Sequence, residues 1–439
     1  MTHSERGNTV VRIKKSLTGV AVAALALTTL AACGSDDSSS SSEGGGPETA
    51  DIRVWLNGED TGQPARDWLK KTFEEQNPGS TLTIEQQEWD GLVEKLTTSL
   101  SSASETPDVV EIGNTQAPTF TSAGAFSPLT GELDAMGGDD LLQGFVEGAT
   151  VDGETYAVPY YAGSKYIFYR KDLFEKSGIE VPTTMDEFVD AAVQLKADNP
   201  KPANFSGFWF PGQDWRNGAT FIWDAGGDLA VDDNGEWSGS LASPESIAGL
   251  ERAQKLFLDA SGAPKDGNET DPWTPFCAGE VGMMSTPGWV KGQLDSPEVG
   301  CPDGFAKDVG VFALPGSDGS AAPVLLGGSD IAIAAKSPNQ ALAQKAVALM
   351  LSEDYQTLMA EGGATPALNS LAPLLGDDEY AAATIEAASN AKLTPAAPGW
   401  ANVEGSRVLE DLFSAIAQGG DVEELAKKAD EQMNSQING

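Results

Sequence analysis

The alternation of predicted strands and helices after residue 50 constrains the fold of this chain most. Short apolar segments predict strands over Ile52–Leu56, Thr81–Gln87 and Asp108–Ile112. Between them, apolar side chains at helical spacing predict one helix that ends at Asn77-Pro78-Gly79 and a second over Asp90–Leu100. This strand–helix order is typical of a mostly parallel sheet with helices on both faces. We therefore expect an α/β fold.

The remaining length and pattern predict two lobes rather than one. Further strands are expected over Tyr166–Tyr169, Val309–Leu314 and Val324–Ala335, and helices over Met185–Asp198 and Ser243–Ala260. About 390 residues follow residue 50, more than one hydrophobic core normally accommodates. Residues 33–50 are rich in Ser, Gly and Asp, and we expect them to form a flexible tether ahead of the two lobes.

The first 33 residues indicate the cellular compartment. A cluster of cations precedes an apolar run over Leu17–Leu30, and Ala31-Ala32-Cys33 follows it. The run has about 14 residues, which suits a signal peptide and is short for a membrane span. Its end resembles the lipobox of bacterial lipoproteins. We expect residues 1–32 to be removed and the exported protein to be anchored to the outer face of the cell membrane by lipid on Cys33. A plain secretion signal with an incidental cysteine is the alternative.

The charge and the histidine count exclude several classes of function. The chain carries 27 Lys and Arg against 66 Asp and Glu, a formal net charge of −39, which repels nucleic acid and anionic membrane surfaces. Its single histidine, His3, lies in the predicted signal peptide. The exported chain would therefore lack the imidazole of Ser-His-Asp triads, Cys-His pairs and His-ligated zinc sites. Catalysis by a carboxylate pair stays open. We expect no cofactor and no metal.

Two cysteines remain after Cys33, namely Cys277 and Cys301. In an oxidising compartment an even pair is expected to form a disulfide. Two buried free thiols are the alternative.

Several motifs, in the same order along the chain, resemble the extracellular solute-binding proteins of sugar ABC importers, the group that includes maltose-binding protein. Single motifs of this kind are weak indicators, but the set spans nearly the whole exported chain. The matching stretches are Val54–Glu59, Pro107–Gln116, Tyr169–Phe174, Gly279–Met284 leading to Pro287-Gly288-Trp289, Ala334–Pro338, and Pro398-Gly399-Trp400.

The resemblance implies a two-lobed, type II periplasmic-binding-protein-like fold, with a ligand held between lobes that close by a hinge. Each lobe would be a mostly parallel sheet flanked by helices. We expect lobe 1 to comprise 51–160 and 329–370, and lobe 2 to comprise 161–328 and 371–439. The three hinge crossings are expected near Tyr160–Ser164, Leu326–Asp330 and Leu368–Leu374.

A sugar site needs flat aromatic platforms and a rim of carboxylate, amide and backbone groups. Trp289 and Trp400 match the stacking positions of the family, although either could be an ordinary core aromatic. Trp215 lies in a polar surround, and Trp89 at a strand-to-helix turn where open α/β sheets bind ligands. We predict that these four indoles contact the ligand.

The polar candidates follow predicted strands or lie at crossings. Asn57 and Glu59 follow the first strand, and Asn114, Thr115 and Gln116 follow the third; helix capping is the alternative role for some of them. Asp224 lies at a helix end, where it could accept hydrogen bonds from sugar hydroxyls or simply belong to a helix terminus. The remaining candidates are Tyr161, Gly328, Ser329, Asp330 and Glu404.

The predicted function is capture of a di- or oligosaccharide and its delivery, unaltered, to the permease subunits of an ABC importer. We expect no enzyme activity, a monomer, no nucleic-acid partner, and membrane contact through the lipid anchor only. The alternatives are a carboxylate-dependent glycoside hydrolase or lyase, an adhesive lipoprotein, and the same fold binding a non-sugar solute.

Overall fold

The structure is a computed structural model that describes residues 49–89, 91–268, 271–294 and 301–439. The predicted signal peptide, the lipidation site at Cys33 and most of the predicted tether lie outside the described residues. Within the described ranges, no helix combines the length and the apolar character needed to cross a bilayer.

A six-stranded mixed sheet forms the first lobe. Its strand order is β14 (Thr365–Pro366), β6 (Ala157–Ser164), β13 (Leu326–Ile333), β3 (Val109–Gly113), β1 (Asp51–Asn57) and β2 (Thr81–Gln87). β1 pairs in parallel with β2 and β3, whereas β13 is antiparallel to β3 and to β6, and β6 is antiparallel to β14.

The α/β class is confirmed, but the expectation of mostly parallel sheets is wrong. The physical reason is that β13 returns from the second lobe and therefore enters the first sheet from the opposite end.

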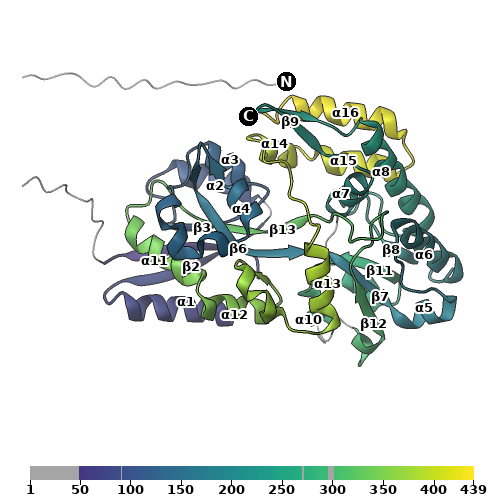
Figure 1. Cartoon of the computed structure of the whole chain (residues 1–439), viewed down its shortest axis with the longest axis horizontal. Helices are drawn as coiled ribbons and strands as arrows, with labels where there is room; N and C mark the ends of the chain where they lie inside the picture. The colour runs from purple at the N-terminus through teal and green to yellow at the C-terminus, as the bar shows by residue number, and fades with distance from the viewer. Residues whose placement is uncertain (1–48, 90, 269–270, 295–300) are drawn as a thin grey trace, which may run out of the picture. The chain divides into compact units, whose positions relative to one another are not determined.

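Helices cover both faces of the first sheet (Figure 1). On one face, α1 (Gln63–Gln76), α11 (Gln340–Met350) and α12 (Glu353–Glu361) pack apolar side chains against Ile52, Val54 and Leu56 of β1. On the other face, α2 (Leu92–Ser101) and α3 (Ala117–Ser122) pack against Trp55 and Ile112. The alternation of side chains along β1 thus supplies two separate cores.

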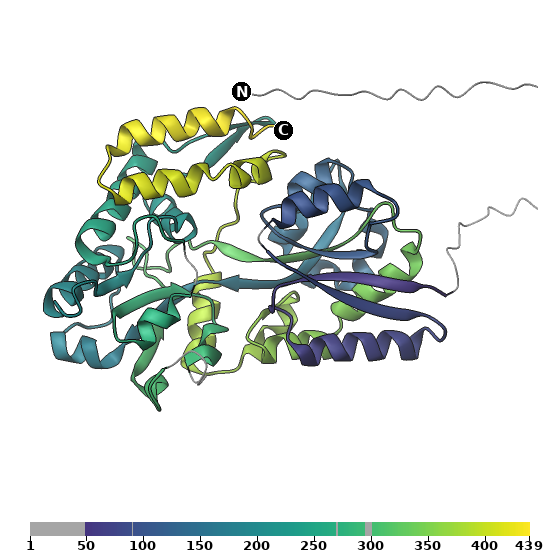
Figure 2. The same ribbon diagram turned by 180° about the vertical axis from the view of Figure 1, so that it is seen from behind.

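The second lobe is built on a four-stranded sheet in the order β12 (Val309–Phe312), β7 (Tyr166–Arg170), β11 (Val281–Thr286) and β8 (Ser206–Trp209). Only β11 and β8 are parallel, so this sheet is also mixed. One large apolar cluster joins it to its helices. These include α6 (Met185–Asp198), α7 (Trp215–Asp224), α8 (Pro244–Lys255), α15 (Val408–Ala417) and α16 (Val422–Asn434). Figure 2 shows α15 and α16 side by side.

The smaller elements complete the two lobes. They are α4 (Gln143–Gly148), β4 (Thr150–Val151), β5 (Glu154–Thr155), α5 (Lys171–Ser177), β9 (Ala230–Asp233), β10 (Glu236–Gly239), α9 (Trp273–Cys277), α10 (Val290–Leu294), α13 (Glu379–Ala388), α14 (Trp400–Gly405) and the short helices η1 (Thr130–Met136), η2 (Gly138–Asp140), η3 (Leu256–Ala260), η4 (Phe305–Asp308) and η5 (Asn369–Leu375).

The chain passes between the two sheets at three places. β6 leads into β7 through Lys165, and β13 starts directly after Leu325. The second crossing is held by the segment before α14, because Leu326 N donates to Lys392 O and Lys392 N donates to Val324 O, both at 2.8 Å. The third crossing joins η5, which packs on α12, to α13, which packs on β12 and β7.

Cys277, at the end of α9, is paired with Cys301, and their Cα atoms are 4.6 Å apart. This separation is within the range that disulfides span.

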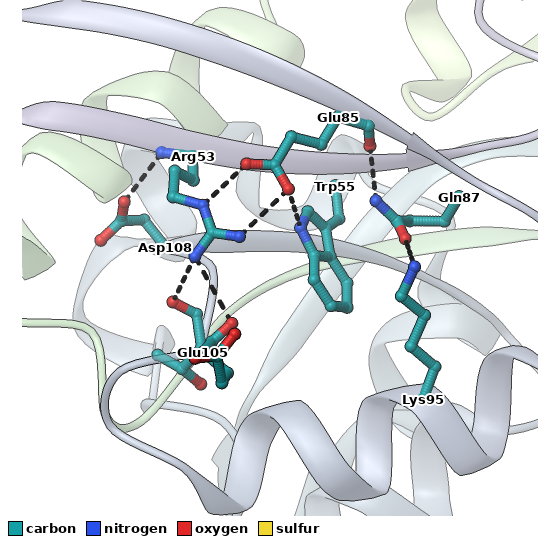
Figure 3. Close-up of polar contacts among 8 residues, drawn as sticks. Arg53, Trp55, Glu85, Gln87, Lys95, Glu105 and Asp108 are labelled. Carbon is teal, nitrogen blue, oxygen red and sulfur yellow. Dashed lines mark hydrogen bonds and ion pairs between the residues drawn. The ribbon is translucent and has the colours of Figure 1, made fainter.

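A polar cluster fixes the register of β1 against β2 (Figure 3). Arg53 donates from Nε and Nη2 to the Glu85 carboxylate at 2.7 and 3.0 Å, and Trp55 Nε1 donates to the same carboxylate at 2.9 Å. The Arg53 backbone N–H donates to Asp108 Oδ2 at 2.8 Å, just ahead of β3. The hydrogen bond from Arg53 lowers the pKa of the Glu85 carboxyl below its usual value. The cluster therefore ties β1 to β2 and to the residue ahead of β3, and the other ends of these strands carry the candidate site.

Candidate functional site

Trp89 lies across the ends of β1 and β3. Its Nε1 donates to Asp60 Oδ2 at 2.7 Å, and 38% of the residue is exposed. Gly58 makes room for the ring, since a Cβ there would approach the indole Cδ1 and Nε1 to 3.3 Å, and its φ of +49° suits glycine. The result is an accessible indole with a carboxylate at its edge.

The Tyr161 hydroxyl is the centre of a polar group beneath Trp89. It lies 3.1 Å from Asp60 Oδ2, 3.0 Å from Glu111 Oε1 and 3.1 Å from Ser329 Oγ. Tyr161 comes from β6 and Ser329 from β13, the two strands that lead to the second lobe. Two of the predicted site residues thus meet at the hinge strands.

Asp60 and Glu111 are the two residues of this group that sequence reasoning did not include among the site residues. Glu111 is fully buried in β3, where its Oε2 accepts from the Asn57 backbone N–H at 2.7 Å and its backbone carbonyl accepts from Asn57 Nδ2 at 3.1 Å. Burial raises the pKa of Glu111 to about 7, and the hydrogen bonds of its carboxylate with the Asn57 backbone N–H and Ser329 oppose the rise. The available signal was one carboxylate inside the otherwise apolar strand Val109–Gly113.

Asn114 and Gly328 join β3 to β13. The Asn114 backbone N–H donates to Gly328 O at 3.1 Å, and its Nδ2 donates to Leu326 O at 3.1 Å. Gly328 has a φ of +145°, and a Cβ there would lie 2.3 Å from Tyr161 O. Both predicted residues therefore serve the geometry of the crossing.

Asp330 follows Ser329 and is buried with its Oδ1 unpartnered. It borders a cavity of about 20 Å³, lined also by Asn114, Phe145 and Thr394, which has room for one water molecule. Burial raises the pKa of Asp330 well above its usual value.

Glu404 of α14 bridges to the loop after β3. Its Oε2 accepts from Thr115 Oγ1 at 3.1 Å and from Gln116 Nε2 at 3.4 Å. In α3, which follows this loop, Thr119 Oγ1 donates to Pro398 O at 2.8 Å. Burial raises the pKa of Glu404, while the positive charge of Arg216 opposes the rise. The predicted residues Thr115, Gln116 and Glu404 are thus brought together.

Trp400 and Trp215 form a second aromatic group next to Glu404. Their ring centroids are 6.3 Å apart in an edge-to-face arrangement, and Arg216 lies 4.8 Å over the Trp215 ring. Both indoles are buried, and Trp215 Nε1 has no hydrogen-bond partner, as is also true of Gln116 Oε1. Buried polar atoms without a partner are uncommon in folded proteins.

Three predicted site residues stand apart from these groups. The Asp224 carboxylate accepts from Arg252 Nη1 and from the Ser317 backbone N–H, both at 2.8 Å, so it holds the second lobe together rather than facing a ligand. Trp289 is 40% exposed, and its ring packs against that of Trp273 in an edge-to-face arrangement with the centroids 5.2 Å apart. Glu59 is exposed on the loop after β1.

Among the described residues, no cluster of three or more His, Cys, Asp or Glu side chains has the arrangement of a metal site.

Two α/β lobes joined by hinge strands, with aromatic and polar residues on loops that meet between them, define a two-lobed solute-binding protein. The chain belongs to the family of bacterial extracellular solute-binding proteins, which matches residues 57–357. Membership of this extracellular family implies that the protein is exported.

Curated proteins are similar to this chain in sequence, and solved structures are similar to it in fold. The chain is 31% identical to the diacetylchitobiose binding protein DasA of Streptomyces coelicolor, over 97% of this chain and 99% of that protein. It is 34% identical to a mannitol-binding protein of Pseudomonas aeruginosa over 31% of each chain. Its fold is similar to that of the GacH receptor of Streptomyces glaucescens, with a TM-score of 0.75 and 21% identity, over 89% of this chain and 98% of that chain. It is also similar to the sugar-binding protein MalE of Xanthomonas citri, with a TM-score of 0.75 and 21% identity, over 88% of this chain and 96% of that chain.

Proposed function

We propose that this protein captures a di- or oligosaccharide between its lobes and delivers it to the permease of an ABC importer. The observation that carries the proposal is the pairing of Trp89 with Asp60 at the strand ends of the first lobe, together with the contacts of Thr115 and Gln116, in the loop after β3, with Glu404 of α14. An indole face suits the C–H face of a sugar ring, while carboxylate and amide groups suit its hydroxyls. The similarity to a diacetylchitobiose binding protein over nearly the whole chain supports an amino-sugar disaccharide as the first ligand to test.

The lobes are proposed to comprise 51–160 with 329–370 and 161–328 with 371–439, and to close on the ligand. The contact between Thr115 and Glu404 would belong to the closed state, since it joins the two lobes. A ligand that binds this state better shifts the population toward it. Lipid anchoring through Cys33 and a monomeric state complete the proposal.

A ligand panel tests this function. Diacetylchitobiose, maltose, cellobiose, mannitol and a dipeptide would each be added to the purified protein during thermal unfolding. A saccharide at 100 times its Kd adds about 2.7 kcal/mol of stability, which raises the Tm by several degrees. A shift with the dipeptide alone would contradict sugar binding. Saccharide recovered intact after long incubation with the protein would oppose a hydrolase, and cleaved product would establish one.

The lipid anchor has its own experiment. Wild type and Cys33→Ser would be expressed in a bacterial host and partitioned between detergent and aqueous phases. We expect wild type in the detergent phase and the variant in the aqueous phase; equal partitioning of both proteins would indicate a plain secretion signal.

A further inference from the structure

Glu111 occupies a position that an ionised carboxylate fits poorly. It is fully buried, and its carboxyl group has three polar neighbours, namely the Asn57 backbone N–H on Oε2, the Tyr161 hydroxyl on Oε1 and the Ser329 hydroxyl. Asp60, which carries a charge of the same sign, shares that hydroxyl. Although Asp60 as a residue is exposed, its carboxyl group lies against Trp89 and Tyr161, and burial raises its pKa above the usual value.

The Tyr161 hydroxyl contacts more carboxyl oxygens than it has protons to donate. A phenol has one proton to donate, but Asp60 Oδ2 and Glu111 Oε1 both lie within hydrogen-bond distance of it. If both carboxyls are ionised, one of these two contacts has no hydrogen. If Glu111 is protonated, it donates to Tyr161, Tyr161 donates to Asp60, and Ser329 Oγ donates to the second lone pair of Tyr161. One extra proton on Glu111 therefore gives a hydrogen to both contacts between the Tyr161 hydroxyl and a carboxyl group.

The charged and titratable groups around Glu111 agree with this count. Asp60 faces it from the loop after β1, and Tyr160 and Tyr161 from β6. Tyr355 of α12 lies behind Tyr160, with their hydroxyls 2.6 Å apart. The cation in this region is Arg66 of α1, which donates to Thr61 O and Gly58 O and whose charge favours ionised Asp60. Burial raises the pKa of Glu111 to about 7, so its proton is exchanged near neutral pH.

We propose that Glu111 is a positioning residue for ligand capture: as a neutral acid it orients Tyr161 toward Asp60, and through Asp60 it holds the Trp89 indole in place for the saccharide. The inference rests on the proposed function. Because a ligand over Trp89 would further desolvate this cluster, binding would favour the protonated form, and ligand capture would be accompanied by proton uptake at neutral pH.

Calorimetric titration with the saccharide identified by the ligand panel tests this role. Titrations at pH 6.0, 7.0 and 8.5, in buffers that differ in heat of ionisation, measure affinity and protons taken up. For wild type we expect affinity to fall about tenfold between pH 6.0 and 8.5, equivalent to a pKa rise of about one unit on binding, with net proton uptake at pH 7.

Two substitutions separate positioning from a purely structural role. Glu111→Gln, a neutral isostere, should keep affinity within about threefold of acidic wild type and lose most of the pH dependence. Glu111→Leu removes the contact to Tyr161 and should lose about tenfold in affinity at every pH. Glu404→Gln is the matched carboxyl control, because Glu404 also has a raised pKa, and its pH dependence should persist.

The outcomes distinguish the two proposals. Absence of saccharide binding by wild type at any pH would overturn the proposed function, and this inference with it. Binding that is independent of pH in wild type, or equally dependent on pH in Glu111→Gln, would overturn the inference alone. Loss of the pH dependence in Glu404→Gln would assign the proton to Glu404 instead.

Discussion

Thr115 donates a hydrogen bond to the Glu404 carboxylate at 3.1 Å, although the two residues are 289 positions apart in the chain. The contact links the loop after β3 in the first lobe with α14 in the second. Because Gln116 and Thr119 add further contacts to the same region, one side of the interface between the lobes is held by several hydrogen bonds.

Removal of the Thr115 hydroxyl should weaken ligand binding through closure. Thr115→Val keeps the shape of the side chain and loses a hydrogen bond to a charged acceptor, which contributes about 1.5–3 kcal/mol. We expect at least a tenfold lower affinity in calorimetry. Thr97→Val is the matched control, since Thr97 Oγ1 bonds Val93 O on the exposed surface of α2. Equal affinities for Thr115→Val and wild type would show that this contact has no part in binding.

Replacement of Trp89 should reduce affinity without unfolding the protein. Trp89→Ala removes an exposed ring, so we expect a Tm close to wild type and an affinity at least tenfold lower, about 1.4 kcal/mol. Trp237→Ala, in β10, is the control for loss of an indole elsewhere. The prediction is contradicted if both variants bind the saccharide like wild type.

Gly328→Ala should be strongly destabilising. The new Cβ would lie 2.3 Å from Tyr161 O and 2.9 Å from the Ala162 Cα, at a φ of +145° that alanine disfavours. Overpacking and backbone strain each cost about 1–3 kcal/mol, so the midpoint of urea unfolding should fall clearly. Gly131→Ala, where a Cβ meets no atom within 4 Å, should leave the midpoint nearly unchanged. A normal midpoint for Gly328→Ala would show that β6 and β13 can separate at little cost.

The ionisation of Glu111 predicts a pH-dependent stability. The folded protein holds this proton to a pKa of about 7, above the ordinary value of 4.5, so the folded state binds more protons than the unfolded state between these values. The free energy of unfolding should therefore fall as pH rises from 4.5 to 7, by up to about 3 kcal/mol from this group.

The comparison with Glu111→Gln isolates this contribution, because other carboxyls titrate in both proteins. Urea unfolding at pH 5.0, 6.0, 7.0 and 8.0 should show that the wild type loses its advantage over the variant as pH rises. A constant difference across this range would contradict the assignment.

Reduction of Cys277–Cys301 should destabilise the second lobe. The two cysteines are separated by 24 positions in the sequence. In the chain-entropy model, closing a loop of this length stabilises the folded state by about 3 kcal/mol. Alkylation with mass spectrometry, before and after reduction, checks that the bond exists. Unfolding of Cys277→Ser/Cys301→Ser should then resemble that of the reduced wild type, and thiols that are alkylated without prior reduction would refute the disulfide.

Local patterns were sufficient to predict much of the fold. The strand over Thr81–Gln87 and the helix over Met185–Asp198 have the predicted bounds, since apolar periodicity and helix-ending signals act over a few residues. The strand directions were not predictable in this way. β13 (Leu326–Ile333) pairs antiparallel with β6 (Ala157–Ser164) because the chain passes through the second lobe between these two strands and then returns to the first sheet.

The sequence by itself determined the elements, the amphipathic faces and the family resemblance, all of which are written in short-range patterns. Only the tertiary structure decided which polar groups meet. Asp224 accepts hydrogen bonds from Arg252 and Ser317. Glu111 and Asp60 both contact the Tyr161 hydroxyl. The physical reason is that hydrogen-bond partners and burial depend on contacts between distant segments, and a side chain of the same type can cap a helix, hold a lobe together or face a ligand.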